Sequence, residues 1–322
     1  MSKFNKLIKN TFILAIVSMF LFQACDKKLQ EGTLEEGMSY KFITKTEGEK
    51  AKDGDILEFN AIYTDDKDSV LHSSIEQGMP IFAKKDSLWG SMKTFEDCLN
   101  LMSAGDSAIF TVPAKAIFKN RMPPNVNTAS FITVNVGMIG FMTEQEARKK
   151  MNENQTSMRM KQIDEMRKLA IENGQELITS EGAEIDEYLA ANNLKAKTTA
   201  SGIRYVITKP GTGDNPKPGD SVKVNYTGYL LNGKVFDSSK EDVAKEHGLY
   251  NERRPYAPIE FQLGVGNVIL GWDEGIGLLN KGAEGKIYIP SPLAYGARAK
   301  GDDIPANAIL VFDIELVDIN GK

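Results

Sequence analysis

Apolar and polar residues alternate in three segments of the C-terminal part of the chain, residues 222–226, 286–289 and 309–317. Alternation with a period of two is typical of half-buried β-strands. The one good helical pattern in this part is short, about residues 270–279, with Trp272, Ile276 and Leu279 on roughly one face. A strand-rich region with one amphipathic helix predicts an α+β fold in which an antiparallel sheet curls around that helix.

The first 24 residues have the pattern of an export signal. Three lysines precede an apolar run over residues 11–22, which is too short to span a bilayer comfortably. The Ala-Cys pair that ends in Cys25 resembles the lipobox of bacterial lipoproteins, in which the cysteine is lipidated and becomes the first residue after cleavage. We therefore expect a signal peptide over 1–24, a membrane lipid on Cys25 and a polar tether over 25–36. Ordinary secretion and an uncleaved anchor are the alternatives.

Length, charge and the positions of histidine and cysteine indicate a protein of two domains that binds neither nucleic acid nor metal. A chain of 322 residues is too long for one typical domain and suggests two domains with a connector. Its net charge of −5, with both signs interspersed, provides no basic stripe for nucleic acid. His72 and His247 are far apart and have no cysteine cluster near them, so no metal site is expected. Cys98, the second of two cysteines, is expected to be a buried small hydrophobic residue.

Five aromatic residues and one carboxylate stand out in the C-terminal part: Tyr226, Phe236, Asp237, Trp272, Tyr295 and Phe312. They lie in the segments Val-Asn-Tyr-Thr-Gly, Val-Phe-Asp-Ser-Ser, Gly-Trp-Asp-Glu-Gly, Ala-Tyr-Gly and Val-Phe-Asp-Ile-Glu. In this order, from about Gly202 to the C-terminus, the segments closely resemble the FKBP-type peptidyl-prolyl cis-trans isomerases. The resemblance implies rotation about X-Pro bonds in a dry aromatic pocket, without nucleophile, metal or cofactor.

The resemblance also implies a role for each site residue. Trp272 would form the floor under the prolyl ring, and the wall would consist of Tyr226, Phe236, Val268, Ile269 and Phe312. The backbone N–H of Ile269 and the hydroxyl of Tyr295 would donate hydrogen bonds to substrate carbonyls. Asp237 would either face the distorted amide or hold Tyr226 in place, and Ile304 would close the loop side.

Two features depart from the family pattern. Ile259 stands where the family usually has another pocket aromatic, so that side of the substrate-binding site loses a ring. Residues 240–257 form a longer segment than the usual loop and bring Arg253, Arg254 and Tyr256 near the expected rim. This segment is either a solvated charged loop or a contact for a client peptide.

The N-terminal half repeats part of this pattern. Residues 53–60 (Asp-Gly-Asp-Ile-Leu-Glu-Phe-Asn) align with 218–225 (Pro-Gly-Asp-Ser-Val-Lys-Val-Asn), and the same register carries residues 70–74 onto 235–239 without a gap. Residues 37–141 are therefore predicted to be a diverged copy of the same fold. The alternative is an unrelated β-rich domain that shares a turn pattern.

The diverged copy lacks the chemistry of the C-terminal one. Tyr226, Phe236, Asp237, Trp272 and Tyr295 correspond in order to Ala61, Leu71, His72, Phe95 and Phe118. The carboxylate, the hydroxyl and one ring are absent. We expect residues 37–141 to fold but not to catalyse.

A long helix is predicted between the copies. The sequence Thr-Glu-Gln-Glu at residues 143–146 is a capping-box pattern, and Asn173-Gly174 is a plausible stop. One face carries Ala147, Met151, Met158, Ile163, Met166 and Ala170. This stripe is consistent with a helix packed on its own flanking domains, with an adaptable surface for unfolded clients, or with a homodimer seam over residues 143–173. A second, shorter helix is expected at about residues 183–193.

These patterns lead to one domain plan and two functional hypotheses. The plan is a signal peptide over 1–24, a tether over 25–36, a diverged FKBP-like domain over 37–141, a helical linker over 142–195 and an isomerase domain over 196–322. The leading hypothesis is a prolyl isomerase for proline-containing unfolded or exported polypeptides, tethered by Cys25 in the cell envelope, at the outer membrane facing the periplasm. The alternative is a non-catalytic scaffold or chaperone lipoprotein.

Overall fold

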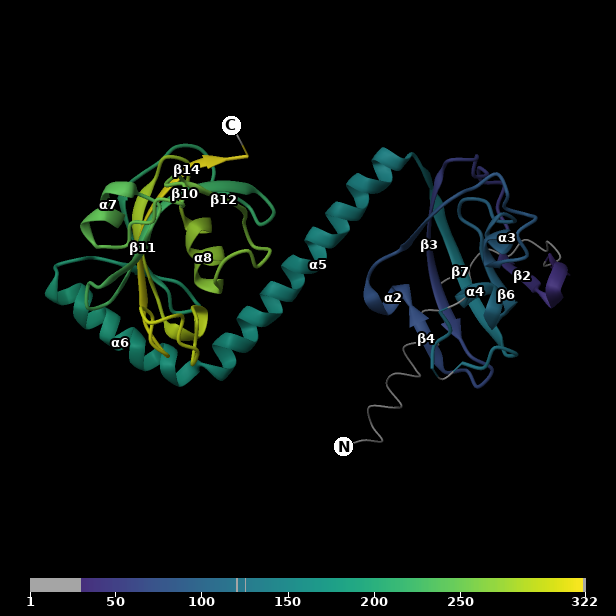
Figure 1. Cartoon of the computed structure of the whole chain (residues 1–322), viewed down its shortest axis with the longest axis horizontal. Coiled ribbons are helices and arrows are strands. Elements are labelled where there is room, and N and C mark those ends of the chain that lie inside the picture. The colour runs from purple at the N-terminus through teal and green to yellow at the C-terminus, as the bar shows by residue number, and fades with distance from the viewer. Residues whose placement is uncertain (1–29, 120, 125, 321–322) are drawn as a thin grey trace. The chain divides into compact units, whose positions relative to one another are not determined.

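The computed structural model describes residues 30–119, 121–124 and 126–320, which belong to two compact units divided between Met151 and Asn152 (Figure 1). The predicted signal peptide and Cys25 lie outside the described residues. Each unit contains one seven-stranded antiparallel sheet with short helices. The expected α+β fold class is therefore confirmed, with one antiparallel sheet in each unit.

The sheet of the C-terminal unit follows the alternation in the sequence. Its strands are β8 (Lys197–Thr198), β9 (Arg204–Lys209), β10 (Ser221–Leu230), β11 (Val235–Ser238), β12 (Ile259–Gln262), β13 (Glu284–Ile289) and β14 (Leu310–Ile319). They pair in the order β11-β10-β14-β13-β9-β8, and β12 also pairs with β10. Along β10 every second residue is buried, as a strand with one face on a core requires.

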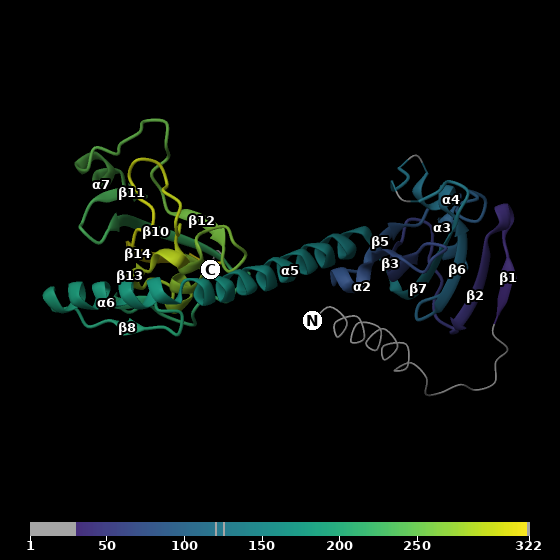
Figure 2. The same cartoon turned by 90° about the horizontal axis from the view of Figure 1, so that it is seen from below.

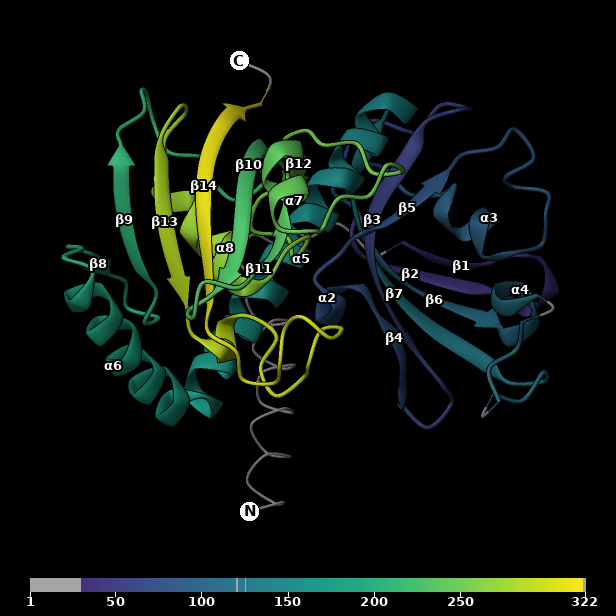
Figure 3. The same cartoon turned by 60° about the vertical axis from the view of Figure 1, so that its left-hand side comes forward.

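Two helices cover the two faces of this sheet. On one face, α8 (Leu270–Gly275) continues into the 3₁₀ turn η2 (Ile276–Leu278) and packs Trp272 and Ile276 into the main core, as predicted. On the other face, α6 (Gln175–Ala191) packs Ile185 and Leu189 against Tyr288 of β13. Figure 3 shows α6 beside the short strand β8. This double cover explains the continuous buried run at the end of β13. The helix α6 is thus part of the C-terminal unit, and it begins well before the expected residue 183.

The N-terminal unit repeats the topology. Its strands are β1 (Glu31–Thr33), β2 (Ser39–Thr44), β3 (Ile56–Thr64), β4 (Val70–Ser73), β5 (Ile81–Lys84), β6 (Ser107–Pro113) and β7 (Phe131–Met142). Its helices are η1 (Glu35–Gly37), α2 (Ser74–Gln77), α3 (Phe95–Leu99) and α4 (Ala114–Phe118). The strand order β1-β2-β6-β7-β3-β4 matches that of the C-terminal sheet, strand for strand, and β5 pairs with β3 as β12 pairs with β10. Figure 2 shows β1, β2, β6, β7 and β3 following one another in this order.

The strand pairing confirms the register of the repeat. In the N-terminal sheet Ile62 lies opposite Ser73, and in the C-terminal sheet Thr227 lies opposite Ser238, the residues that the sequence alignment equates. Cys98 is a free cysteine buried in the N-terminal core, as expected, and burial raises the pKa of its thiol to about 12.

The N-terminal sheet begins earlier than residue 37. Residues 31–33, which the sequence assigned to the tether, form β1 and pair with β2. Leu34 packs on the core, and its N–H donates to the carbonyl of the buried Met38 at 2.8 Å. Leu34 and Met38 hold this polar segment at the edge of the sheet. The polar composition of residues 31–33 alone does not predict a strand.

The connecting helix α5 (Glu144–Asn173) has the predicted cap. The Glu146 carboxylate accepts from the N–H and the hydroxyl of Thr143 at 2.9 and 2.7 Å, and the helix ends at the predicted residue. Two members of its methionine stripe, Met151 and Met166, are 48% and 55% exposed. Among the helices of the described ranges, none is long and apolar enough to cross a bilayer.

Candidate active site

A group of aromatic rings packs together in the C-terminal core. The indole of Trp272, only 4% exposed, has the rings of Tyr226 and Phe312 edge-on at 5.0 Å between centroids. Phe236 is edge-on to Phe312 at 5.7 Å, and Phe261 lies 6.0 Å from Trp272. We call these five residues the ring cluster. Four of them were predicted as site residues, and the structure brings those four together.

Phe261 was not predicted as a site residue. It lies on β12 two residues after Ile259, on the same face of the strand, so its ring adds aromatic surface beside the position where Ile259 lacks one. Ile259 itself is half-buried and pairs with Val224 of β10. The period-two spacing of Ile259 and Phe261 in the sequence could have identified Phe261 as a neighbour of the site.

The other predicted lining residues surround the same core. Val268, Ile269 and Tyr295 are half-buried and pack against it, and Ile304 is buried within it. Ile269 is the N-cap residue of α8, in extended conformation, three residues before Trp272. The turn before it is held by the buried Asp273 carboxylate, which accepts from the N–H groups of Gly264 and Gly266 at 2.8 and 3.2 Å.

The ring cluster needs a glycine in β10. A Cβ atom added at Gly228 would lie 2.6 Å from the ring of Phe236 and 2.7 Å from that of Phe312. Real Cβ atoms do not approach ring carbons so closely, so the two rings occupy the space that a side chain would take. A glycine inside a strand often marks such a close approach.

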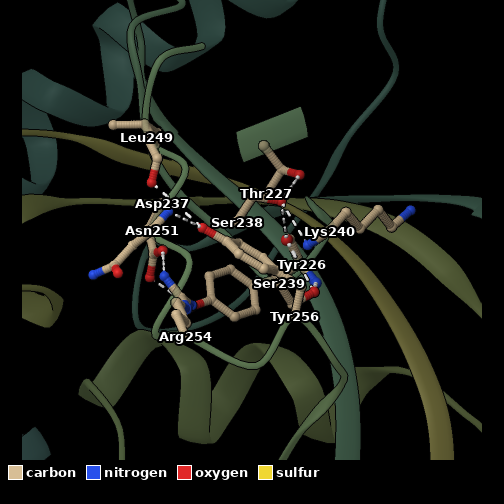
Figure 4. A network of polar contacts seen from close by, with 10 residues as sticks. All are labelled: Tyr226, Thr227, Asp237, Ser238, Ser239, Lys240, Leu249, Asn251, Arg254 and Tyr256. Carbon is tan, nitrogen blue, oxygen red and sulfur yellow. Dashed lines mark hydrogen bonds and ion pairs between the residues drawn. The ribbon is translucent and has the colours of Figure 1, made fainter. Parts of the chain in front are cut away.

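The hydroxyl of Tyr226, a member of the ring cluster, belongs to a network of polar contacts (Figure 4). The Tyr226 hydroxyl donates to Oδ2 of Asp237 at 2.5 Å, and Nη2 of Arg254 donates to that hydroxyl at 3.0 Å. Nη1 of Arg254 forms an ion pair with Oδ1 of Asp237. Burial, followed by the bond to Asp237, raises the pKa of Tyr226 to about 12. The sequence left two roles open for Asp237, facing the distorted amide or holding Tyr226. In the structure its carboxylate makes the contact that holds Tyr226.

Arg254 comes from the long segment after β11. This segment contains α7 (Glu241–Glu246), and the rings of Tyr250 and Tyr256 stack within it at 5.6 Å. The Tyr256 hydroxyl accepts from the Asn251 N–H at 2.9 Å. The interpretation of this segment as a merely solvated loop is therefore wrong at Arg254, because its guanidinium is bound to two site residues. Arg253, by contrast, is exposed.

Two serines fix the strand that carries Tyr226. Oγ of Ser239 accepts from the Tyr226 N–H at 2.9 Å, and Oγ of Ser238 donates to the Tyr226 carbonyl at 3.0 Å. The N-terminal unit keeps the first contact, since Oγ of Ser74 accepts from the Ala61 N–H at 3.0 Å. The Ser-Ser pair is thus a structural feature of both copies. Only the C-terminal copy has a carboxylate, Asp237, directly before the pair.

In the N-terminal unit a tyrosine fills the corresponding space. Tyr63 lies opposite His72 in the β3–β4 pair, as Gly228 lies opposite Asp237 in the β10–β11 pair. Its ring is edge-on to Phe95 at 5.9 Å and to His72 at 5.5 Å. Burial raises the pKa of its hydroxyl to about 12. Where the C-terminal copy has Gly228 with the rings of Phe236 and Phe312 against it, the N-terminal copy carries the ring of Tyr63.

A groove of about 520 Å³ in the C-terminal unit lies elsewhere. It is lined by the second half of α5, including Met160 and Ile163, and by Pro218, Leu263 and Leu278. None of the ring cluster residues lines it.

Comparisons with known proteins agree with the C-terminal site. Residues 213–317 match the family model for the FKBP-type peptidyl-prolyl cis-trans isomerase. The chain is 44% identical over 132 residues to a probable FKBP-type peptidyl-prolyl cis-trans isomerase of Haemophilus influenzae, which covers 41% of this chain and 48% of the relative. It is 46% identical over 136 residues to the FKBP-type isomerase FkpA of Aeromonas hydrophila, covering 42% of this chain and 45% of that protein.

A shorter relative is matched along almost its whole length. FK506-binding protein 1 of Kluyveromyces lactis is 40% identical over 126 residues, which are 39% of this chain and 99% of that protein. The chain spans about half the length of the two bacterial relatives. The matched residues contain all the segments that carry the ring cluster and Asp237, and the chain belongs to the FKBP-type peptidyl-prolyl cis-trans isomerases.

Proposed function

We propose that the C-terminal unit accelerates cis-trans isomerisation of X-Pro bonds. Rotation about an amide faces a barrier of roughly 18–20 kcal/mol, because the C–N bond has partial double-bond character. In the twisted transition state the amide loses resonance and becomes less polar. A water-poor surface of rings therefore favours the twisted form over the planar one, and no bond has to be made or broken. The ring cluster around Trp272 is the observation that supports this chemistry.

Each residue then has a physical task. Trp272 supports the prolyl ring, and Tyr226, Phe236, Phe312 and the aliphatic Val268 and Ile269 exclude water around it. The N–H of Ile269 and the hydroxyl of Tyr295 donate to the substrate carbonyls that flank the rotating bond. Burial and then the Asp237 carboxylate raise the pKa of Tyr295, so its hydroxyl keeps its proton and remains a donor.

Asp237 acts in this proposal by orienting Tyr226. Its carboxylate has one oxygen on the Tyr226 hydroxyl and the other on Arg254, so its charge is compensated before substrate binds. A compensated carboxylate keeps the edge of the ring cluster rigid and does not attract water into it as a free charge would. Arg254 thereby becomes part of the site's framework.

The test is a proline-peptide assay with the full chain. We expect acceleration over the uncatalysed reaction and a loss of at least about tenfold in Asp237→Ala. The matched control is His72→Ala, the equivalent position of the N-terminal unit, which should retain full activity. No acceleration by the wild-type chain would refute the proposal, and equal activity in both variants would refute the site assignment.

We also propose that the protein works from a membrane, through a lipid on Cys25, on proline-containing segments of exported polypeptides in the cell envelope. The export-signal pattern and the Ala-Cys pair at its end support this, because X-Pro isomerisation is a slow step in folding. The expected site is the outer membrane facing the periplasm. Cys25→Ala should abolish lipid labelling and membrane fractionation; unchanged labelling would contradict the tether.

A second proposal is a holding function without catalysis. Two observations favour it: the Tyr63 ring that fills the N-terminal copy, and the exposed Met151 and Met166 on α5. If the protein has this holding function, suppression of client aggregation survives Phe236→Ala and is lost in the double variant Met151→Lys, Met166→Lys. Sedimentation of the same variants distinguishes a homodimer seam on α5 from a client surface, because only the seam changes the oligomeric state of the free protein.

A further inference from the structure

A buried carboxylate on α6 contacts the loop that carries Tyr295. The side chain of Glu181 is 7% exposed, and Ser291 is fully buried. Oε2 of Glu181 accepts from the Ser291 N–H at 2.6 Å, and Oε1 accepts from the Ser291 hydroxyl at 2.6 Å. Burying a carboxylate is costly unless its oxygens are hydrogen-bonded, and both of these are. The contact joins two residues 110 positions apart in sequence.

Ser291 connects Glu181 to the backbone on both sides of Tyr295. It is the first residue of the 3₁₀ turn η3 (Ser291–Leu293), and its carbonyl accepts from the N–H of Ala294 at 2.9 Å and from that of Gly296 at 2.8 Å. These two amides are the immediate neighbours of Tyr295 on either side. The backbone that bears the Tyr295 ring is thus fixed to the one residue that Glu181 holds with two bonds.

The helix that presents Glu181 is itself fixed. A Cβ atom added at Gly182 would lie 2.6 Å from both terminal nitrogens of Arg204, so the guanidinium lies directly on the α6 backbone beside Glu181. Arg204 also pairs with Asp186, one turn further along α6, at 3.0 and 2.8 Å. With Ile185 buried beneath the helix, these contacts fix the α6 backbone from which Glu181 reaches Ser291.

We propose that Glu181 is a positioning residue of the isomerase, which sets the place of the Tyr295 hydroxyl through Ser291. The inference rests on the proposed function for its effect on rate, and on the geometry alone for its effect on the loop. It makes α6, outside the residues that match the family model, part of the active-site framework. An apolar residue could fill the space under η3, but it could not fix the direction of the Ser291 carbonyl.

The experiment compares full-chain variants in the proline-peptide assay. Glu181→Ala should lower kcat/KM about tenfold, because a displaced donor no longer meets the substrate carbonyl. Glu181→Gln should stay within about twofold of wild type, since its carbonyl accepts from the Ser291 N–H and its amide donates to the hydroxyl. Glu184→Ala, an exposed glutamate on the same helix, is the matched control and should show no change.

Coupling to Tyr295 separates positioning from a general loss of structure. In a Tyr295→Phe background, Glu181→Ala should cost no more than about twofold, because the hydroxyl it positions is gone. An equal tenfold loss in both backgrounds would overturn the proposal. Should Glu181→Ala fail to fold, Ser291→Ala, which removes only the hydroxyl bond, serves in the same cycle with an expected loss of about threefold.

A second measurement does not depend on activity. Amide hydrogen exchange at Ala294 and Gly296 should be at least about tenfold faster in Glu181→Ala than in Glu181→Gln, with the same midpoint of global unfolding. Unchanged exchange would overturn the positioning of the loop. Faster exchange in a chain whose wild type shows no isomerase activity would refute the proposed function and leave the positioning of the loop supported.

Discussion

Tyr63 and Gly228 occupy the same position in the two sheets, each directly opposite the residue that distinguishes the copies, His72 in one and Asp237 in the other. At Gly228 the rings of Phe236 and Phe312 come within 2.7 Å of where a Cβ would lie. At Tyr63 the chain places a ring of its own against Phe95. At this position the C-terminal copy accommodates two rings from neighbouring strands, whereas the N-terminal copy supplies a ring of its own.

The first prediction concerns Gly228→Ala. The added methyl group must displace Phe236 or Phe312, so we expect a loss of at least about tenfold in isomerase activity and ~1–3 kcal/mol in the free energy of unfolding. Peptide assays and urea unfolding measure the two effects. Gly137→Ala, at a strand position with nothing within 4 Å of the new Cβ, is the control. Wild-type activity in Gly228→Ala would mean that these rings are not the catalytic surface.

Tyr63→Ala should affect stability without affecting catalysis. Loss of the half-buried ring leaves a cavity beside Phe95 and should lower the free energy of unfolding of the N-terminal unit by about 2–3 kcal/mol. Fluorescence of Trp89, which packs on that core, reports this unfolding in a Trp272→Phe background. Isomerase activity of Tyr63→Ala should equal that of wild type. New activity that persists when Asp237→Ala is added would contradict the assignment of a filled, non-catalytic copy.

Replacing Arg254 should lower the rate of isomerisation, although this residue lies in the long segment after β11. Arg254→Gln leaves the Asp237 carboxylate uncompensated and Tyr226 held by one bond, so we expect kcat/KM to fall about fivefold. Arg253→Gln, next to it in sequence and exposed, removes the same charge from the same loop. Equal losses in the two variants would assign the effect to loop charge, and the contact with Asp237 would then have no role.

The raised pKa of Tyr226 predicts a dependence of stability on high pH. An unfolded tyrosine titrates near pH 10, whereas the folded pKa is about 12, so the stability linked to this group is complete below pH 10 and is lost as pH rises toward 12. Urea unfolding at pH 8, 10 and 11 measures it. Tyr226→Phe should show a smaller decline over this range, with the other buried tyrosines as the common background. Parallel declines would mean that burial and Asp237 do not raise the pKa of Tyr226 in the folded protein.

Local patterns in the sequence predicted much of this structure. Alternation located β10, β13 and β14, the capping box located the start of α5, and the order of aromatic segments identified four members of the ring cluster. These features are encoded within a few residues of each other, where strand and helix periods are visible.

Contacts between distant segments could not be predicted in the same way. Arg254 reaches Asp237 across a folded loop, and Glu181 reaches Ser291 from a helix that the sequence presented as a linker. Neither pairing leaves a periodic trace, because each depends on how separate elements pack. The strand β1 was missed for a similar reason, since its polar residues are held at the edge by their neighbours Leu34 and Met38.

The most direct test of the central claim is a matched pair of substitutions in one proline-peptide assay. Phe236→Ala and Leu71→Ala remove equivalent residues from the C-terminal and N-terminal copies. Catalysis by the C-terminal ring cluster predicts a loss of at least about tenfold in kcat/KM for Phe236→Ala and wild-type activity for Leu71→Ala. Equal activity in the two variants, or a loss confined to Leu71→Ala, would contradict it.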